Sequence, residues 1–191
     1  RVLFRSVSTL STPRMESSIN GVTCIKGEIS SLMTLMRLNT RWSDSSGRRR
    51  ILMDASFQDE DPLMLAFRRL NTYLEGIFDL REVDCVAYIS PFHQVIVSDL
   101  ASGPLTQAAL SSLSKFALYG FLSPQYPRVQ EGIRLVADCI SNCIFEGTDW
   151  ESDEVIFMKL LELSALTLRC DASPMLSVGA AWEIYSTCLN I

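Results

Sequence analysis

Apolar residues recur at steps of three and four along most of the chain after residue 18. One such series runs Ile25, Ile29, Leu32 and Met36. The same spacing returns over residues 63–77 and 129–143. Steps of this size place side chains on one face of an α-helix. No window alternates apolar and polar residues with hairpin turns, so the pattern predicts helices rather than strands.

Helix start signals agree with this spacing. Asp61-Pro62 and Ser90-Pro91 each pair an N-cap residue with a proline at the first helical position, and Ser102-Gly103-Pro104 does the same. Thr148 and Glu151 match a capping box. Together these signals predict seven helices, at residues 18–42, 61–80, 83–98, 103–121, 128–144, 151–170 and 176–191.

The short linkers favour antiparallel neighbours stacked in layers. We therefore expect an all-α fold, an armadillo-like stack of about seven antiparallel helices (an α-solenoid), in one domain over residues 18–191. The helices near 83–98, 103–121 and 151–168 are apolar on more than one side, so we expect each to be covered on several sides.

Residues 1–17 stand apart from this pattern. Residues 1–14 carry three arginines, several serines and no acid, a composition that resembles a transit peptide. No amphipathic stripe is evident, which favours the alternative of a disordered leader or a leftover of cloning or gene annotation.

Composition and charge narrow the class of protein. With 48% hydrophobic residues among 191, the chain is not of a disordered type. Its net charge of −5 argues against a general nucleic-acid binder. The charge is uneven, because residues 1–50 hold nine of the 17 basic residues and three of the 22 acids. We expect a basic N-terminal end on an acidic helical stack, suited to protein contacts.

The six cysteines are scattered, which favours reduced thiols in the cytoplasm. Cys139 and Cys143 lie four apart and could offer two metal thiolates, but no second pair has matching spacing, so buried apolar packing is the better interpretation. The most apolar stretch, residues 155–168, is too short and too charged to span a bilayer.

His93 is the only histidine, so catalytic zinc sites with several imidazoles are impossible within one chain. The start signal at Ser90-Pro91 places His93 in a first helical turn. No nucleophile or acid stands beside it in sequence, and we interpret it as a surface or packing residue. We predict no catalytic site, no metal and no cofactor.

Four motifs follow one another in a specific order. They are Gly27-Glu28-Ile29 with Asn39-Thr40-Arg41-Trp42, then Pro91-Phe92 with Val95-Ile96, then Gly103-Pro104-Leu105-Thr106 with Lys115-Phe116, and last Phe145, Thr148-Asp149 and Ser152-Asp153-Glu154-Val155. Over residues 20–191 this order resembles the N-terminal dimerisation and cyclophilin-binding domain of the large, Golgi-type Arf guanine-nucleotide exchange factors.

This resemblance implies a regulatory domain without exchange activity of its own. It implies self-association into a homodimer and contact with the neighbouring helical regulatory domain. Cyclophilin is a further implied partner, and nucleic acid is not one. The full-length protein would be cytoplasmic and peripheral at Golgi membranes.

The resemblance also supplies interface candidates. Lys115 occupies the lysine of one motif and Glu154 the second acid of another, positions that the family associates with the dimer contact. Their apolar neighbours Phe116, Tyr119 and Met158 would supply most of the binding energy. Two other interpretations stay open: an ion pair within one chain, or an acid that serves the helix dipole at Glu154.

Two other functions remain as alternatives. One is a general helical protein-interaction scaffold unrelated to Arf. The other is an enzyme that depends on a cysteine or on His93.

Overall fold

The computed structural model describes residues 21–45, 61–144 and 150–191, and for residues 39–45 and 150–152 it describes the backbone alone. Across these residues the chain is helical and has no strand, which confirms the predicted all-α class. Residues 1–17 and the capping box at Thr148 lie outside the described part. The elements are α1 (Gly21–Ser45), α2 (Pro62–Tyr73), η1 (Leu80–Glu82), α3 (Cys85–Ile96), α4 (Gly103–Leu118), α5 (Val129–Ser141), α6 (Trp150–Arg169), η2 (Ser173–Met175) and α7 (Val178–Asn190).

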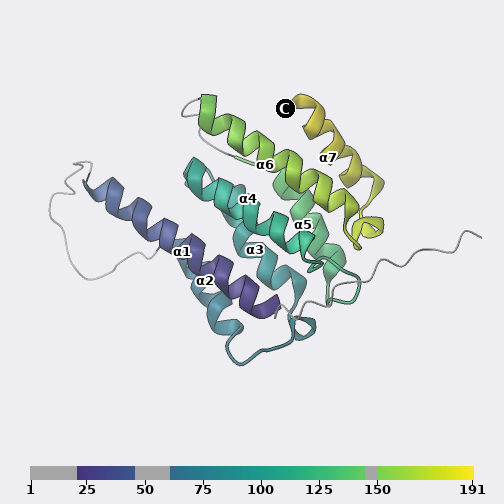
Figure 1. The fold of residues 1–191 in the computed structure, drawn as a ribbon, viewed down its shortest axis with the longest axis horizontal. Helices are drawn as coiled ribbons and strands as arrows, with labels where there is room; N and C mark the ends of the chain where they lie inside the picture. Colours follow the sequence, from purple (N-terminus) through teal and green to yellow (C-terminus); the bar gives the residue numbers. More distant parts are fainter. Residues whose placement is uncertain (1–20, 46–60, 145–149) are drawn as a thin grey trace, which may run out of the picture.

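The helices form two rows (Figure 1). One row holds α1, α4 and α6, and the other holds α2, α3, α5 and α7. Helices α3 and α5, which are neighbours in one row, run in the same direction. The start of α3 packs on the start of α5, and beyond the end of α5 the Ile144 N–H donates to the carbonyl of Ile96, the last residue of α3. This layered arrangement is an α-solenoid, as the short linkers predicted.

Helix α2 is shorter than the predicted 61–80. It begins as expected, with the Asp61 carboxylate accepting a hydrogen bond from the Leu63 N–H at 2.9 Å. It ends at Tyr73, and Gly76 adopts a φ of +80°, a left-handed conformation that glycine enters without steric cost. The apolar series runs past this end because Leu74 and Ile77 still pack on the core. Periodicity alone could not locate the helix terminus.

The predicted helix start at Ser90-Pro91 is wrong. Helix α3 begins at Cys85, because the Asp84 side chain caps it by accepting from the Val86 N–H at 2.8 Å. Pro91 lies inside the helix and is buried, so α3 tolerates the loss of one backbone donor. His93 therefore sits in the last turn of α3 rather than in a first turn.

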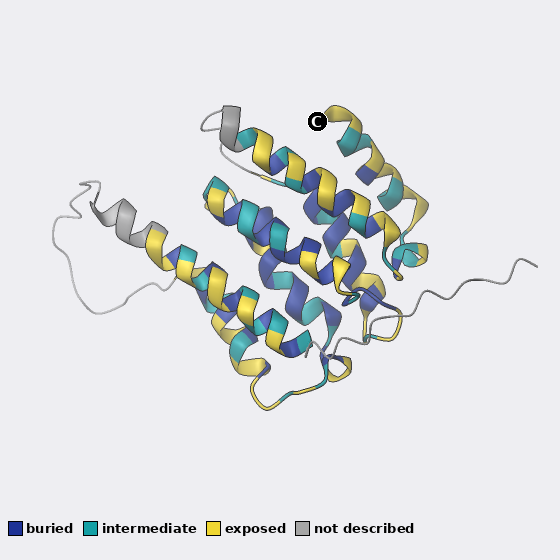
Figure 2. Ribbon diagram, in the orientation of Figure 1, coloured by how far each residue is buried: buried dark blue, intermediate teal, exposed yellow. Residues whose placement is uncertain are grey.

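An edge-to-face cluster of aromatic rings fills the centre between α2, α3 and α4. The Phe92 ring lies 5.1 Å from Phe67 and 5.2 Å from Phe116, both nearly perpendicular. The buried Tyr88 hydroxyl donates to the Phe121 carbonyl at 2.7 Å. Buried residues accordingly concentrate in the middle of the stack (Figure 2).

The three strongly apolar helices were each expected to be covered on several sides, and α6 departs from this prediction. Helices α3 and α4 are covered on several sides, as expected. No described residue covers the outer face of α6, since Met158, Leu161 and Leu168 remain between 37% and 61% exposed. Within the described part of the chain, α6 packs mainly against α4, α5, α7 and η2, which lie on its other sides.

The sequence predicted reduced cysteines and no membrane-spanning helix. All six cysteines are free thiols. Among the described helices, none combines the length and the apolar character that a bilayer span needs.

Candidate functional site

Lys115, the first interface candidate, lies near the end of α4 and pairs with α1. Its ammonium lies 2.7 Å from one carboxylate oxygen of Glu28, and the Ser112 hydroxyl donates to the other oxygen at 2.8 Å. Glu28 is mostly covered, whereas about half of Lys115 stays exposed. The lysine therefore fastens α1 to α4 and still reaches the surface.

Glu154, the second candidate, is exposed near the start of α6 and makes no ion pair with any described residue. It lies far from Lys115 within the chain. A Cβ added at Gly103, at the start of α4, would lie 3.7 Å from the Ile156 side chain at the start of α6. The two helices therefore begin next to each other. Lys115 is twelve residues further along α4, about 18 Å at 1.5 Å per residue. The intrachain partner of Lys115 is Glu28 and not Glu154.

The three apolar candidates occupy different environments. Phe116 is 0% exposed and packs against Phe92 and Phe121, so its side chain offers no surface to a partner. Phe116 belongs to the core. Tyr119 follows α4 and is about half exposed, and Met158 projects from α6. Both can meet another protein.

Met158 belongs to an exposed apolar stripe on α6. Val155, Met158, Leu161, Ala165 and Leu168 follow one another at steps of three and four and are all exposed. The stripe is directly opposite the buried face that holds Ile156, Leu160 and Leu163. Glu154 adjoins it, so an apolar surface and an unpaired acid stand together.

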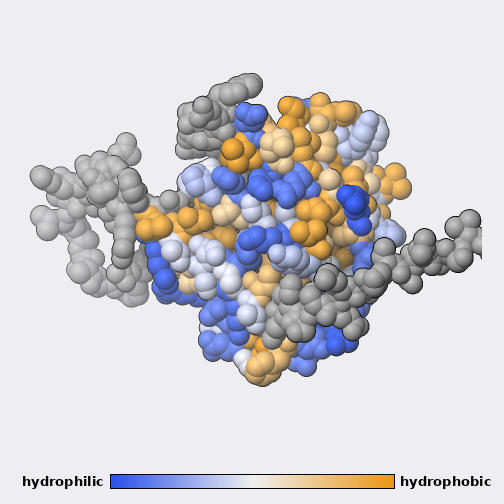
Figure 3. Space-filling model, in the orientation of Figure 1, coloured by the Kyte–Doolittle hydropathy of each residue, from blue (hydrophilic) through white to orange (hydrophobic). Residues whose placement is uncertain are grey.

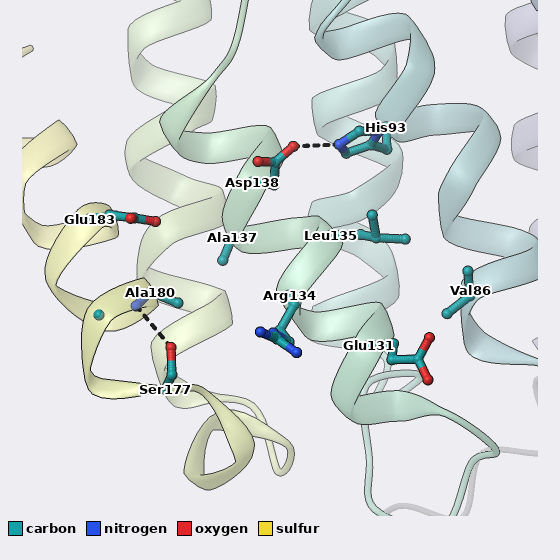
Figure 4. A pocket seen from close by; sticks show the side chains of 11 residues that line it. Val86, His93, Glu131, Arg134, Leu135, Ala137, Asp138, Ser177, Ala180 and Glu183 are labelled. Carbon is teal, nitrogen blue, oxygen red and sulfur yellow. Dashed lines mark hydrogen bonds and ion pairs between the residues drawn. The ribbon is translucent and has the colours of Figure 1, made fainter.

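His93 borders a cavity of about 670 Å³ between α3, α5 and α7 (Figure 4). Its Nε2 lies 2.6 Å from an Asp138 oxygen, and Asn142 donates to the other oxygen at 2.8 Å. Among the described lining residues, Ser177 is the only hydroxyl, and it caps α7 by accepting from the Ala180 N–H. No nucleophile stands beside the imidazole there. His93 ties α3 to α5, which agrees with a packing residue.

The thiols of Cys139, which is buried, and of Cys143, which is half-buried, are poor nucleophiles and poor metal ligands. Burial raises the pKa of Cys139 well above its usual value and raises the pKa of Cys143 to about 12, so both stay protonated at neutral pH. No group of His, Cys, Asp and Glu among the described residues could hold a metal ion. Cys139 lies in the hydrophobic core, and Cys143 is partly buried and packs against it.

Sequence reasoning missed a second exposed stripe, on α7. Val178, Trp182, Tyr185 and Leu189 all lie on the surface. Their spacing of four, three and four was visible in the sequence as an apolar helix face. That spacing alone does not tell whether the face is inward or outward.

Three large Arf guanine-nucleotide exchange factors contain a region that is similar to this chain. The chain is 30% identical over 171 residues to the ARF guanine-nucleotide exchange factor GNOM and 33% identical over 171 residues to the ARF guanine-nucleotide exchange factor GNL1, both of Arabidopsis thaliana. It is 27% identical over 173 residues to the Golgi-specific brefeldin A-resistance guanine nucleotide exchange factor 1 homolog of Caenorhabditis elegans. No family model matches the chain.

The matches cover 87–90% of this chain and 8–11% of each relative, in the N-terminal region. The chain thus spans about a tenth of the length of these relatives. It is similar to a small N-terminal part of large Arf guanine-nucleotide exchange factors.

Proposed function

We propose that this chain is a regulatory, non-catalytic part of a large Arf guanine-nucleotide exchange factor that acts in Golgi vesicle trafficking. It works by self-association and by contact with the neighbouring helical regulatory domain. The observation that carries the proposal is the exposed apolar stripe of α6 beside the unpaired Glu154, at positions that the motifs mark. The similarity to the N-terminal part of such exchange factors supports it.

The two charged candidates suit a two-fold contact. Lys115 and Glu154 lie at opposite ends of the α4–α6 pair. When two such surfaces meet in antiparallel fashion, each lysine comes near the other copy's acid. Met158 and Tyr119 are both exposed and can provide apolar area, in place of the buried Phe116.

Light scattering on the purified chain tests self-association. We expect a dimer at micromolar concentration and weaker dimers for Lys115→Glu and Glu154→Lys, because each substitution places like charges together. The double variant should regain dimer, since it restores opposite charges. A monomeric wild type would contradict the proposal.

Glu28→Gln is the matched control. It removes the ion pair between α1 and α4 but leaves the Lys115 charge in place. We expect it to remain dimeric. If Glu28→Gln loses as much dimer as Lys115→Glu, then Lys115 acts through the placement of α1 and not at the interface.

The parent protein would carry the exchange activity, would be peripheral at Golgi membranes and would offer cyclophilin a binding site. The coding sequence beyond Ile191 separates this from a general helical scaffold. An exchange domain encoded downstream supports the proposal, and its absence favours the scaffold.

A further inference from the structure

A groove of about 410 Å³ lies between α2 and α3. Both helices give it an apolar lining: Ala66 and Leu70 come from α2, and Val86, Ala87 and Pro91 come from α3. Several polar side chains border the same space, and most of them have no partner in the described part of the chain. An apolar cleft with a few convergent polar groups is the usual form of a ligand site.

The groove is on the side of α3 that is turned away from α4. Tyr88 and Phe92 reach Phe116 of α4, whereas Val86 and Gln94 of the groove lie on the opposite face of α3. The row of α1, α4 and α6 is the one nearer the viewer in Figure 1, and Figure 3 shows hydrophobic patches on that face. The groove is therefore separate from the interface candidates on α4 and α6.

Arg69 is the cation of the groove that no described acid neutralises. The other cation, Arg128, is held by Asp84 at 2.7 Å and by Glu131. Asp84 is itself fully engaged, because its second oxygen accepts from the Val86 N–H. Arg69 is exposed and makes no ion pair with any described residue. The groove can thus accept one negative charge, and a carboxylate suits it better than a doubly charged phosphate.

Pro91 adds a backbone acceptor to the same groove. Proline has no N–H, so the carbonyl of Ala87, four residues earlier in α3, lacks the helical donor that residue 91 would supply. Backbone polar groups without a helical partner are normally satisfied from elsewhere. The N–H of a bound chain can supply this bond. Ser90 and Gln94, whose side chains have no hydrogen-bond partner among the described residues, can bind its other amide groups.

We propose that this groove binds an extended segment of a partner protein that carries an acidic residue. The carboxylate pairs with Arg69, a backbone N–H donates to the Ala87 carbonyl, and an apolar side chain packs between Leu70 and Val86. An extended segment suits the groove because its own backbone groups are free to form hydrogen bonds. This inference goes beyond the proposed function and does not depend on self-association.

A peptide array incubated with the whole chain tests the proposal. The array carries matched octapeptides that hold glutamate, glutamine or phosphoserine at one fixed position, within varied neutral flanks. We expect the glutamate peptides to bind best, and their glutamine counterparts to bind about tenfold more weakly, because the charge-assisted bond to Arg69 is lost. Fluorescence anisotropy with the strongest glutamate peptide then gives dissociation constants for variants.

Arg69→Gln should weaken this peptide about tenfold and leave its glutamine counterpart unchanged. Arg68→Gln is the matched control, because Arg68 is also exposed on α2 but does not border the groove. Pro91→Ala restores the N–H that the Ala87 carbonyl lacks, so it should weaken the peptide about fivefold although it removes a helix breaker. Circular dichroism checks that each variant is folded.

Three results would overturn the proposal. The first is equal or absent binding of the glutamate and glutamine peptides. The second is a loss in Arg68→Gln as large as that in Arg69→Gln, which would mean attraction by the general charge of α2. The third is stronger binding of the phosphoserine peptides, which would assign the groove to a phosphorylated partner instead.

Discussion

At Gly132 the backbone of α5 lies so close to side chains of α3 that one more carbon would not fit. A Cβ there would lie 2.5 Å from the Cys85 sulfur and 3.1 Å from an Ile89 methyl. Gly27 in α1 is the opposite case, because no atom lies within 4 Å of its added Cβ. The same residue type thus has two roles that only the packing separates.

Gly132→Ala should therefore destabilise the fold by about 1–3 kcal/mol, because the core cannot expand freely. Gly27→Ala should be neutral or stabilising by up to about 1 kcal/mol, since alanine favours an exposed helix. Urea unfolding at one protein concentration measures both. Cys85→Ala in the Gly132→Ala background should recover part of the loss, and equal effects at the two glycines would refute the close approach.

At the scale of elements, α3 and α4 form the centre of the stack. They share the perpendicular rings of Phe92 and Phe116 and are buried on several sides. The motif containing Lys115-Phe116 therefore combines a surface residue with a core residue. Neighbours in a helix point about 100° apart, so adjacent motif residues need not share a role.

Phe116→Ala should lower the free energy of unfolding by about 3–5 kcal/mol, because it empties a site among three aromatic rings. Tyr119→Ala, at a half-exposed position three residues on, should cost about 1 kcal/mol or less. Denaturant unfolding compares the two. Similar losses at both positions would mean that Phe116 is not part of the core.

Across the whole molecule, burial falls from the centre toward α7. Nine residues of α4 are buried, but Ile184 is the one buried residue of α7. Helices held by few buried side chains open most easily. Among the described helices, α7 is thus the one held by the fewest buried side chains.

Hydrogen exchange should show this gradient. We expect the α7 amides to exchange faster than those of α3 and α4 in dilute samples, where the chain is monomeric. Protection of α7 equal to that of α4 in dilute samples would contradict the gradient.

Seven helices, their apolar faces and the likeness to Arf exchange factors could all be predicted from the sequence, because helical periodicity and residue order are local properties. The residues of the stripes through Ile25 and through Ile133 share one helix face, as predicted, and the structure buries that face. The end of α2 and the interior position of Pro91 could not be predicted from the apolar spacing. Helix α2 ends before the left-handed Gly76 although the apolar series continues, and α3 begins at the Asp84 cap although Ser90-Pro91 also has the form of a helix start.

Tertiary structure alone decided which faces are inside. Periodicity tells which side chains share a face, but the neighbours that cover the face come from distant parts of the chain. Phe116 is covered by Tyr88 and Phe92 of α3, and Lys115 meets Glu28, 87 residues away in sequence. The stripe of Trp182 has the same spacing as a core stripe and still lies outside, because α5 and α6, the described helices that contact α7, pack on its other sides.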